Sequence, residues 1–219
     1  QSRGLGDVYK RQAYYDTESD VWTGYVMSGQ VTSLYTLSIP NYQLVVNMAG
    51  ELVETSVDNG DGTFTYNVPV RQGYTWSDGS PITANDWQFT FDTVKGLSLG
   101  GNFLSAYPYL CEADDGSSKN CVVSVVATDD YTVSVTFNYD PGLSTWQYGT
   151  AQGPAFSKAY WESIATDKES LYAHDAINAP VASAFVYDKL EQGAFYTWKY
   201  DANTMWYGGT TTICLLYTS

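Results

Sequence analysis

Histidine and basic residues are scarce in this sequence. Its 219 residues include one histidine and ten lysines and arginines against 24 acidic residues, which gives a formal net charge of −14 at pH 7. Binding to nucleic acids and to anionic membranes depends on clusters of Lys and Arg that neutralise phosphate charge. The sequence contains no such cluster, so we expect no nucleic-acid partner and no binding to anionic lipid surfaces.

Long apolar segments and metal donors are missing as well. No run reaches the roughly 18 apolar residues that mark a membrane-spanning helix. His174 is the only histidine, and no cysteines stand at Cys-x-x-Cys spacing, so nickel or zinc binding is disfavoured. The stretch 58–62 resembles the start of a calcium loop but lacks the downstream glutamate that such a loop uses. We therefore expect no metal and no cofactor.

Cysteine is rare, and its spacing is informative. Cys111 and Cys121 flank a polar stretch that is typical of an exposed loop. Because no metal-binding residues accompany them, the spacing favours a disulfide over the alternative of two unpaired thiols. A disulfide in turn indicates an oxidising, extracytoplasmic compartment.

The two ends of the sequence are related as an inverted repeat. Residues 7–12 can be encoded by DNA whose reverse complement, read one base along, encodes residues 214–218 and the start of a serine codon. Protein physics gives no reason for this relation, and the repeat resembles a transposon end that is used to prepare sequencing libraries. We interpret residues 1–12 and 213–219 as translated adapter and residues 13–212 as natural sequence. A natural basic leader is the alternative for the amino end.

Alternating apolar residues predict two β-hairpins. The two-residue period over 64–70 indicates a half-buried strand, and the Asn-Gly and Asp-Gly pairs before it predict a turn that leads in from an earlier strand over 52–57. The segments 122–127 and 131–137 show the same pattern around a short turn. Together these hairpins predict an antiparallel sheet.

A helix start is indicated at Thr83–Asp86, where the spacing of Thr and Asp is that of a capping box. Apolar residues follow at helical spacing over 87–94. Part of this segment also fits a strand, but the cap and the closing 95–96 favour a helix. Two short helices are expected over 159–164 and 167–174. The mixture of hairpins and helices predicts an α+β fold.

The segment 51–97 carries a family resemblance. It contains Asp-Gly-Thr-Phe-Thr-Tyr, then Arg-Gln-Gly, then Trp-Ser-Asp-Gly-Ser-Pro, then Thr-Ala-Asn-Asp, all at fixed spacings. In this pattern it resembles the signature region of the peptide- and nickel-binding family, family 5, of ABC-importer solute-binding proteins. Weaker likeness extends over 126–137 and over 180–209. The signature positions, to which we assign a structural role, are Arg71, Gly73, Trp76, Asp78, Gly79, Pro81, Ala84 and Asp86.

The resemblance implies a periplasmic-binding-protein-like fold. Residues 13–212 would then form a partial lobe that includes a small inserted subdomain around 45–175, with the second lobe missing. The sequence departs from the family at 182–186, where Ala-Ser-Ala-Phe-Val replaces the usual Gly-Thr-Gly-Pro-Tyr. Alanine does not readily take the positive dihedral angles that glycine allows.

The resemblance also implies a function. The protein would be the substrate-binding component of an ABC importer, without catalysis of its own, and would close around a peptide or a similar small solute. It would work in the periplasm or at the outer face of the cell membrane, with or without a lipid anchor, and deliver the solute to membrane permease subunits. Aromatic walls suit such pockets. The candidates, each with core packing as its alternative, are Tyr35, Tyr107, Tyr109, Trp146 and Tyr148.

Two other functions fit the aromatic and acidic composition. A secreted glycan hydrolase requires two carboxylates across a cleft, and no Asp or Glu here lies in a recognisable catalytic motif. A carbohydrate-binding or adhesion domain of the β-sandwich type requires strands at short, regular intervals, which the helix opened by Thr83–Asp86 interrupts. We therefore expect a binding protein and not an enzyme.

Overall fold

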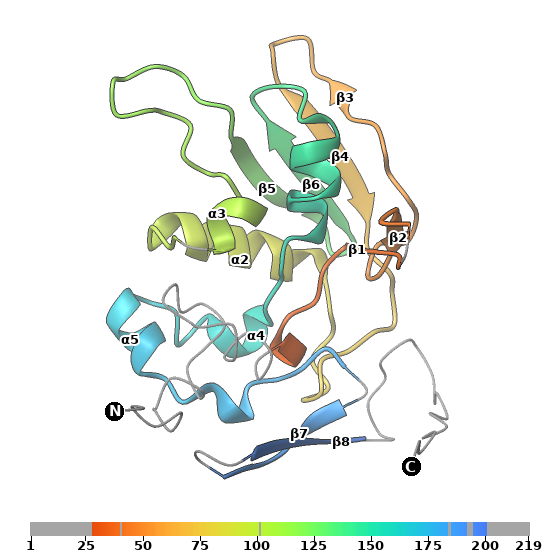
Figure 1. Cartoon of the computed structure of the whole chain (residues 1–219), viewed down its shortest axis with the longest axis vertical. Helices are drawn as coiled ribbons and strands as arrows, with labels where there is room; N and C mark the ends of the chain where they lie inside the picture. Colours follow the sequence, from red (N-terminus) through yellow and green to blue (C-terminus); the bar gives the residue numbers. More distant parts are fainter. Residues whose placement is uncertain (1–27, 40, 101, 184, 192–194, 201–219) are drawn as a thin grey trace.

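A computed structural model gives the fold of the protein, and its elements divide between an upper and a lower part in Figure 1. The predicted adapter segments, 1–12 and 213–219, lie outside the described residues. The residues that the structure describes are 28–39, 41–100, 102–183, 185–191 and 195–200.

The upper part contains an antiparallel four-stranded sheet in the order β3-β4-β6-β5. Both expected hairpins are present, and β4 and β6 pair along their whole length, with Tyr66 opposite Val135. The expected strand over 52–57 is wrong in extent, because only Val57 and Asp58 pair with β4. The strands are β3 (Val57–Asp58), β4 (Phe64–Pro69), β5 (Val122–Asp129) and β6 (Thr132–Phe137).

Helix α2 (Ala84–Gly96) packs against β5 and β6. Its N-cap is Thr83, whose N–H donates to the Asp86 carboxylate at 2.9 Å. This is the reciprocal bond that a capping box predicts. Phe91 and Val94, one turn apart, are buried in the same core as the apolar residues of the sheet. The helix predicted from the cap is therefore confirmed.

Asp86 also ties α2 to its neighbours. Its carboxylate accepts hydrogen bonds from Trp76 Nε1 at 3.3 Å and from the N–H of Lys158 at 2.8 Å, in addition to the bond from Thr83. Burial raises the pKa of Asp86 from its ordinary value of 3.8 to about 6, because desolvation outweighs these N–H donors and the nearby Lys158 charge. One carboxylate thus joins three segments: the turn at Trp76–Ser80, which we call the signature turn, the helix α2, and the chain that follows residue 157.

The raised pKa predicts a pH dependence of stability. The unfolded chain releases the Asp86 proton near pH 3.8 and the folded chain near pH 6, so between these values the folded state binds more protons. The contribution is fully present below pH 3.8 and is lost as the pH rises through 6. We expect the difference in unfolding free energy between the wild type and Asp86→Asn to be about 2–3 kcal/mol larger at pH 4 than at pH 7.5. Urea titrations at both pH values measure it, and a difference that shrinks at low pH would contradict the assignment.

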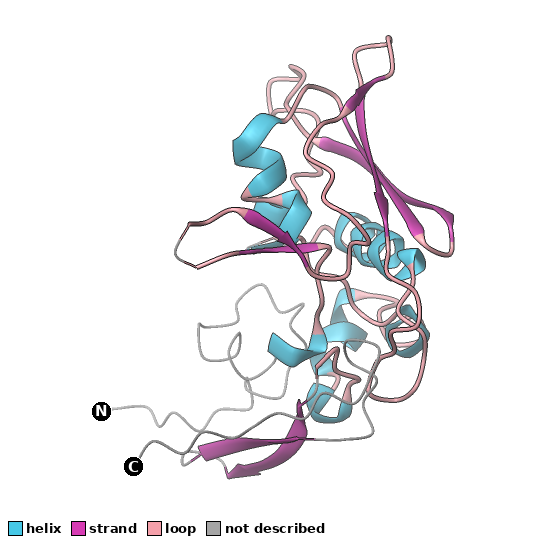
Figure 2. Ribbon diagram, turned by 90° about the vertical axis from the view of Figure 1, so that its right-hand side faces the viewer, coloured by secondary structure: helices cyan, strands magenta, loops and turns pink. Residues whose placement is uncertain are grey.

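The lower part contains short helices and a further hairpin. Figure 2 shows the β7–β8 pair at the opposite end of the molecule from the four-stranded sheet. The two predicted helices over 159–164 and 167–174 appear as α4 and α5. The remaining elements of both parts, in chain order, are η2 (Ser28–Gln30), β1 (Tyr35–Leu37), β2 (Leu44–Val46), α3 (Asn102–Ala106), η3 (Leu143–Gln147), η4 (Thr150–Gln152), α4 (Lys158–Trp161), α5 (Lys168–Ala173), η5 (Ala176–Asn178), β7 (Phe185–Glu191) and β8 (Phe195–Tyr200).

Backbone hydrogen bonds join segments that are far apart in the sequence where the two parts meet. Thr32 and Ala155 exchange two bonds, of 3.1 and 2.7 Å, and the N–H of Ala182 donates to the Gly29 carbonyl at 2.8 Å. The signature turn takes part, because Ser77 N–H donates to the Val181 carbonyl at 2.9 Å and Val181 N–H donates to Ser77 Oγ at 3.0 Å. We call these pairings the neck.

The departure from the family pattern at 182–186 causes no left-handed backbone in the part that is described. Ala182 and Ser183 both lie outside the positive-φ region. The Ser183 hydroxyl instead accepts a hydrogen bond from Phe185 N–H at 3.1 Å. Alanine and serine therefore fit this segment without the freedom of glycine.

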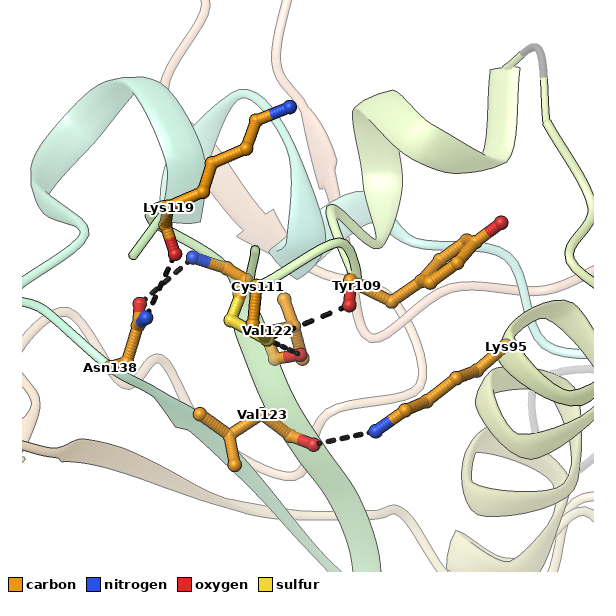
Figure 3. The surroundings of a disulfide bond; sticks show 8 residues. Lys95, Tyr109, Cys111, Lys119, Val122, Val123 and Asn138 are labelled. Carbon is orange, nitrogen blue, oxygen red and sulfur yellow. Dashed lines mark hydrogen bonds between the residues drawn. A yellow bond between two sulfur atoms is a disulfide. The ribbon is translucent and has the colours of Figure 1, made fainter. Parts of the chain in front are cut away.

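Cys111 and Cys121 form a disulfide at the base of the 112–120 loop (Figure 3). Asn138, just beyond β6, also binds the end of this loop. Its Nδ2 donates to the Lys119 carbonyl at 2.8 Å, and its Oδ1 accepts from Cys121 N–H at 2.9 Å. The disulfide and this side chain together fix the start of β5 against the end of β6.

Candidate functional site

A pocket of about 370 Å³ opens between the sheet and η3. Its buried side is an aromatic pair: Tyr66 of β4 and Trp146 of η3 stack with ring centroids 3.8 Å apart and planes within 10°. Leu44 and Leu143 contribute apolar surface, and Glu54 and Asp140 contribute carboxylates. We call this the Tyr66–Trp146 pocket. Its volume lies in the range of small-molecule sites.

The turn after β6 gives the pocket its shape. Asp140-Pro141-Gly142 follows soon after β6, and Gly142 precedes η3 with φ 55° and ψ −161°. This combination is one that side-chain-bearing residues avoid, so glycine suits the position. The short π-helix that follows carries Trp146, whose ring stacks on Tyr66.

The electrostatics of the pocket are negative. Glu54 and Asp140 are exposed, and the lining includes no Lys, Arg or His. The pKa of Tyr66 is raised, first by burial of its hydroxyl and second by the negative charge of Asp140. The pocket therefore combines apolar aromatic surface with two negative charges.

Tyr35 and Trp146, both predicted as ligand-contacting residues, lie in the core next to one another. The Tyr35 hydroxyl donates to the Glu51 carbonyl at 2.9 Å and accepts from Val53 N–H at 3.1 Å, and burial raises its pKa to about 12. Trp146 Nε1 donates to the Val53 carbonyl at 3.1 Å. These bonds occupy the backbone of Val53, which explains why the strand predicted over 52–57 pairs with β4 only at its end.

Tyr107 and Tyr109 are buried as well. The Tyr107 hydroxyl donates to the Pro154 carbonyl at 2.9 Å, and its burial raises the pKa. The Tyr109 hydroxyl donates to the Leu99 carbonyl at 2.8 Å. Neither residue lines the Tyr66–Trp146 pocket. Both hydroxyls are satisfied inside the protein, which supports core packing over ligand contact for these two tyrosines.

Tyr148 differs from the other four candidates because 54% of its surface is exposed. It lines a smaller pocket of about 210 Å³ together with Phe103 of α3 and Pro154. The five candidates are thus not brought to one wall: Trp146 lines one pocket, Tyr148 lines another, and the remaining three lie in the core.

The signature positions form a turn and not a pocket. Gly79 N–H donates to the Trp76 carbonyl at 2.9 Å, and Asp78 Oδ1 accepts from Ser80 N–H at 2.9 Å. Gly79 has φ 87°, where a side chain would be strained. Trp76 is buried beside Asp86. These contacts lie within the protein, and the structural role of the signature stays a prediction.

Metal donors do not gather anywhere in the described part of the chain, where no group of three His, Cys, Asp or Glu side chains could hold an ion. His174, the only histidine, follows α5 and is half-buried, with its Nε2 2.9 Å from the Tyr160 hydroxyl and its ring against Trp161. A membrane-crossing helix is likewise not found among the described residues.

The fold aligns with a part of the structures of periplasmic oligopeptide-binding proteins. It aligns with the oligopeptide-binding protein AppA from Bacillus subtilis, solved with a nonapeptide, at TM-score 0.61 and 15% identity over 90% of this chain and 35% of that chain. It aligns with a periplasmic oligopeptide-binding protein from Thermotoga maritima, solved with mannohexaose, at TM-score 0.62 and 18% identity over 93% of this chain and 33% of that one.

The sequence places the chain in one family. Residues 47–213, well over half of the chain, match the model described as bacterial extracellular solute-binding proteins, family 5 Middle, and the chain belongs to this family. It is also 36% identical over 77 residues to the dipeptide-binding protein DppE of Bacillus subtilis (strain 168), which corresponds to 33% of this chain and 14% of DppE. The resemblance stated from the signature segment is confirmed, and so is the α+β, periplasmic-binding-protein-like fold.

The chain spans about a third of the length of the solved structures that it matches. The hydrolase alternative is decided against, because the family is one of solute-binding proteins. The β-sandwich alternative fails on the fold, since α2 packs directly on the sheet. The division into adapter, partial lobe and inserted subdomain stays a prediction.

Proposed function

We propose that this chain is part of the substrate-binding component of an ABC importer, which captures peptides outside the cytoplasm and delivers them to a membrane permease. The observation that carries the proposal is the family match over residues 47–213. The relatives support peptides as the solute class, since one is described as dipeptide-binding and another was solved with a nonapeptide. In this family-level scheme, two lobes close by hinge motion around the solute.

Among the residues that the structure describes, few side chains are free to hold a peptide. Four of the five aromatic candidates are buried, and their polar atoms are bonded to the chain itself. Capture of a peptide requires backbone partners and pockets on both sides of it. We therefore propose that the peptide site is completed by sequence outside these residues, and that the protein is anchored or free at the outer face of the cell membrane.

Calorimetric titration with trialanine, a mixed-sequence nonapeptide and mannohexaose tests this proposal. A protein extended to the length of the relatives is expected to bind at least one of the two peptides with a micromolar dissociation constant, and the 219-residue chain to bind it at least about 100-fold more weakly, because it offers only part of the contact surface. Tight, saturable binding by the 219-residue chain would contradict the shared site. Binding of mannohexaose but of neither peptide by the extended protein would overturn the solute class.

A further inference from the structure

The Tyr66–Trp146 pocket has no assigned role in peptide capture, and it has features of a ligand site. It has a volume of about 370 Å³ and a buried aromatic pair on one side. Apolar surface that lines a concave site of this size, together with a few polar groups, is the usual composition of a small-molecule pocket. The apolar residues are not all covered, because Leu143 is 71% exposed beside the opening.

The two carboxylates decide which chemistry the pocket favours. Glu54 and Asp140 reach it from separate segments, one before β3 and one after β6. Within the described part of the chain neither forms an ion pair, since the ion pair found there joins Lys158 and Glu162. The lining includes no positively charged side chain, so a positively charged ligand would be attracted by both carboxylates.

The aromatic pair supplies the second half of the argument. Tyr66 and Trp146 are 3% and 2% exposed and stack on each other, so they give the pocket a small apolar floor, which suits an apolar group and not a charged one. An anion would be repelled by both carboxylates, and a neutral apolar molecule would leave their charges without a partner. The raised pKa of Tyr66, to which Asp140 contributes, agrees with a negative potential at this point.

We propose that the Tyr66–Trp146 pocket binds a small organic cation, namely an ammonium- or guanidinium-bearing molecule with an apolar body. The cationic group lies between Glu54 and Asp140, and the apolar body packs against the exposed Leu143 and reaches the floor that Tyr66 and Trp146 form. The site is built within this chain, so it is separate from the peptide site proposed above and does not rest on it.

Calorimetry on the 219-residue chain tests the proposal with a matched pair of probes. Phenethylamine is a cation with an aromatic body, and 2-phenylethanol has nearly the same shape without the charge. We expect saturable binding of phenethylamine with a dissociation constant of about 1 mM, at least about tenfold tighter than that of the alcohol. Raising the salt from about 50 to 500 mM weakens the binding of the amine, since exposed charges are screened. Failure of phenethylamine to bind, or equal binding of the alcohol, would overturn the proposal.

A pair of double variants locates the binding. Glu54→Gln with Asp140→Asn neutralises the pocket, and we expect it to weaken phenethylamine binding about tenfold. Glu112→Gln with Asp114→Asn changes the net charge equally on the exposed disulfide loop and is expected to leave binding unchanged. All four side chains are exposed, so both proteins should keep the wild-type circular dichroism spectrum. Equal weakening by both double variants would show diffuse attraction to an acidic protein and would overturn the site.

Discussion

Replacing Trp146 with alanine is expected to lower the unfolding free energy of this chain by about 3–5 kcal/mol, as for other large-to-small changes of a buried tryptophan. The ring is 2% exposed and stacks on Tyr66 at 3.8 Å. Its edge contacts include Tyr35 and Phe137, with centroids 6.2 and 6.4 Å away. The variant also leaves the Val53 carbonyl without its indole donor. Urea unfolding followed by circular dichroism measures the loss.

The matched control is Tyr148→Ala, two residues along the same segment. Tyr148 is 54% exposed, so its truncation is expected to change the unfolding free energy by no more than about 0.5 kcal/mol. The two residues were predicted together as parts of a ligand-binding wall, and the comparison separates them. If the two variants lose the same stability, the burial of Trp146 in the core is not its main contribution.

Removing the disulfide is expected to have the second large effect. In the chain-entropy account, closing a loop of about 11 residues stabilises the folded state by about 3 kcal/mol, because the unfolded chain loses freedom. Cys111→Ser with Cys121→Ser should therefore lower the midpoint of urea unfolding, and a reducing agent should do the same to the wild type. The bond fixes the start of β5, so the loss also affects the sheet.

Two controls accompany this experiment. Cys214→Ser removes a cysteine outside the pair and is expected to leave the midpoint unchanged. The reducing agent should have no further effect on the Cys111→Ser, Cys121→Ser variant. A wild-type midpoint that is insensitive to reduction would show that the pairing does not stabilise the folded protein.

Features encoded in local sequence were predicted correctly. The capping box at Thr83–Asp86 depends on residues three apart, and α2 begins there. The hairpin of β5 and β6 depends on alternation around a short turn, and it forms with the expected pairing. The disulfide followed from two cysteines and an exposed loop. In each case the partners are close in the chain, so spacing alone contains the information.

Features that depend on distant partners were not predicted. Tyr35 and Trp146 were candidates for a ligand-contacting wall, with core packing as the alternative, and the sequence alone could not decide between the two. The two rings pack against each other, and each side chain forms a hydrogen bond with the backbone of Val53. These two bonds join residues that are 18 and 93 positions apart in the sequence. The same bonds shorten β3, since a strand whose backbone is used by side chains cannot continue its ladder. The Tyr66–Trp146 pocket was missed for the same reason, because its lining comes from four separate segments.

The neck has a consequence for how this architecture can change. Thr32 and Ala155, which bond to each other, bracket the whole upper sheet with its helix α2, so that piece of chain starts and finishes at one place. A segment whose two ends lie next to each other can be lengthened, shortened or replaced while the path of the remaining chain stays the same. A short linker that joins positions 32 and 155 is therefore the natural place at which to remove or replace the upper part.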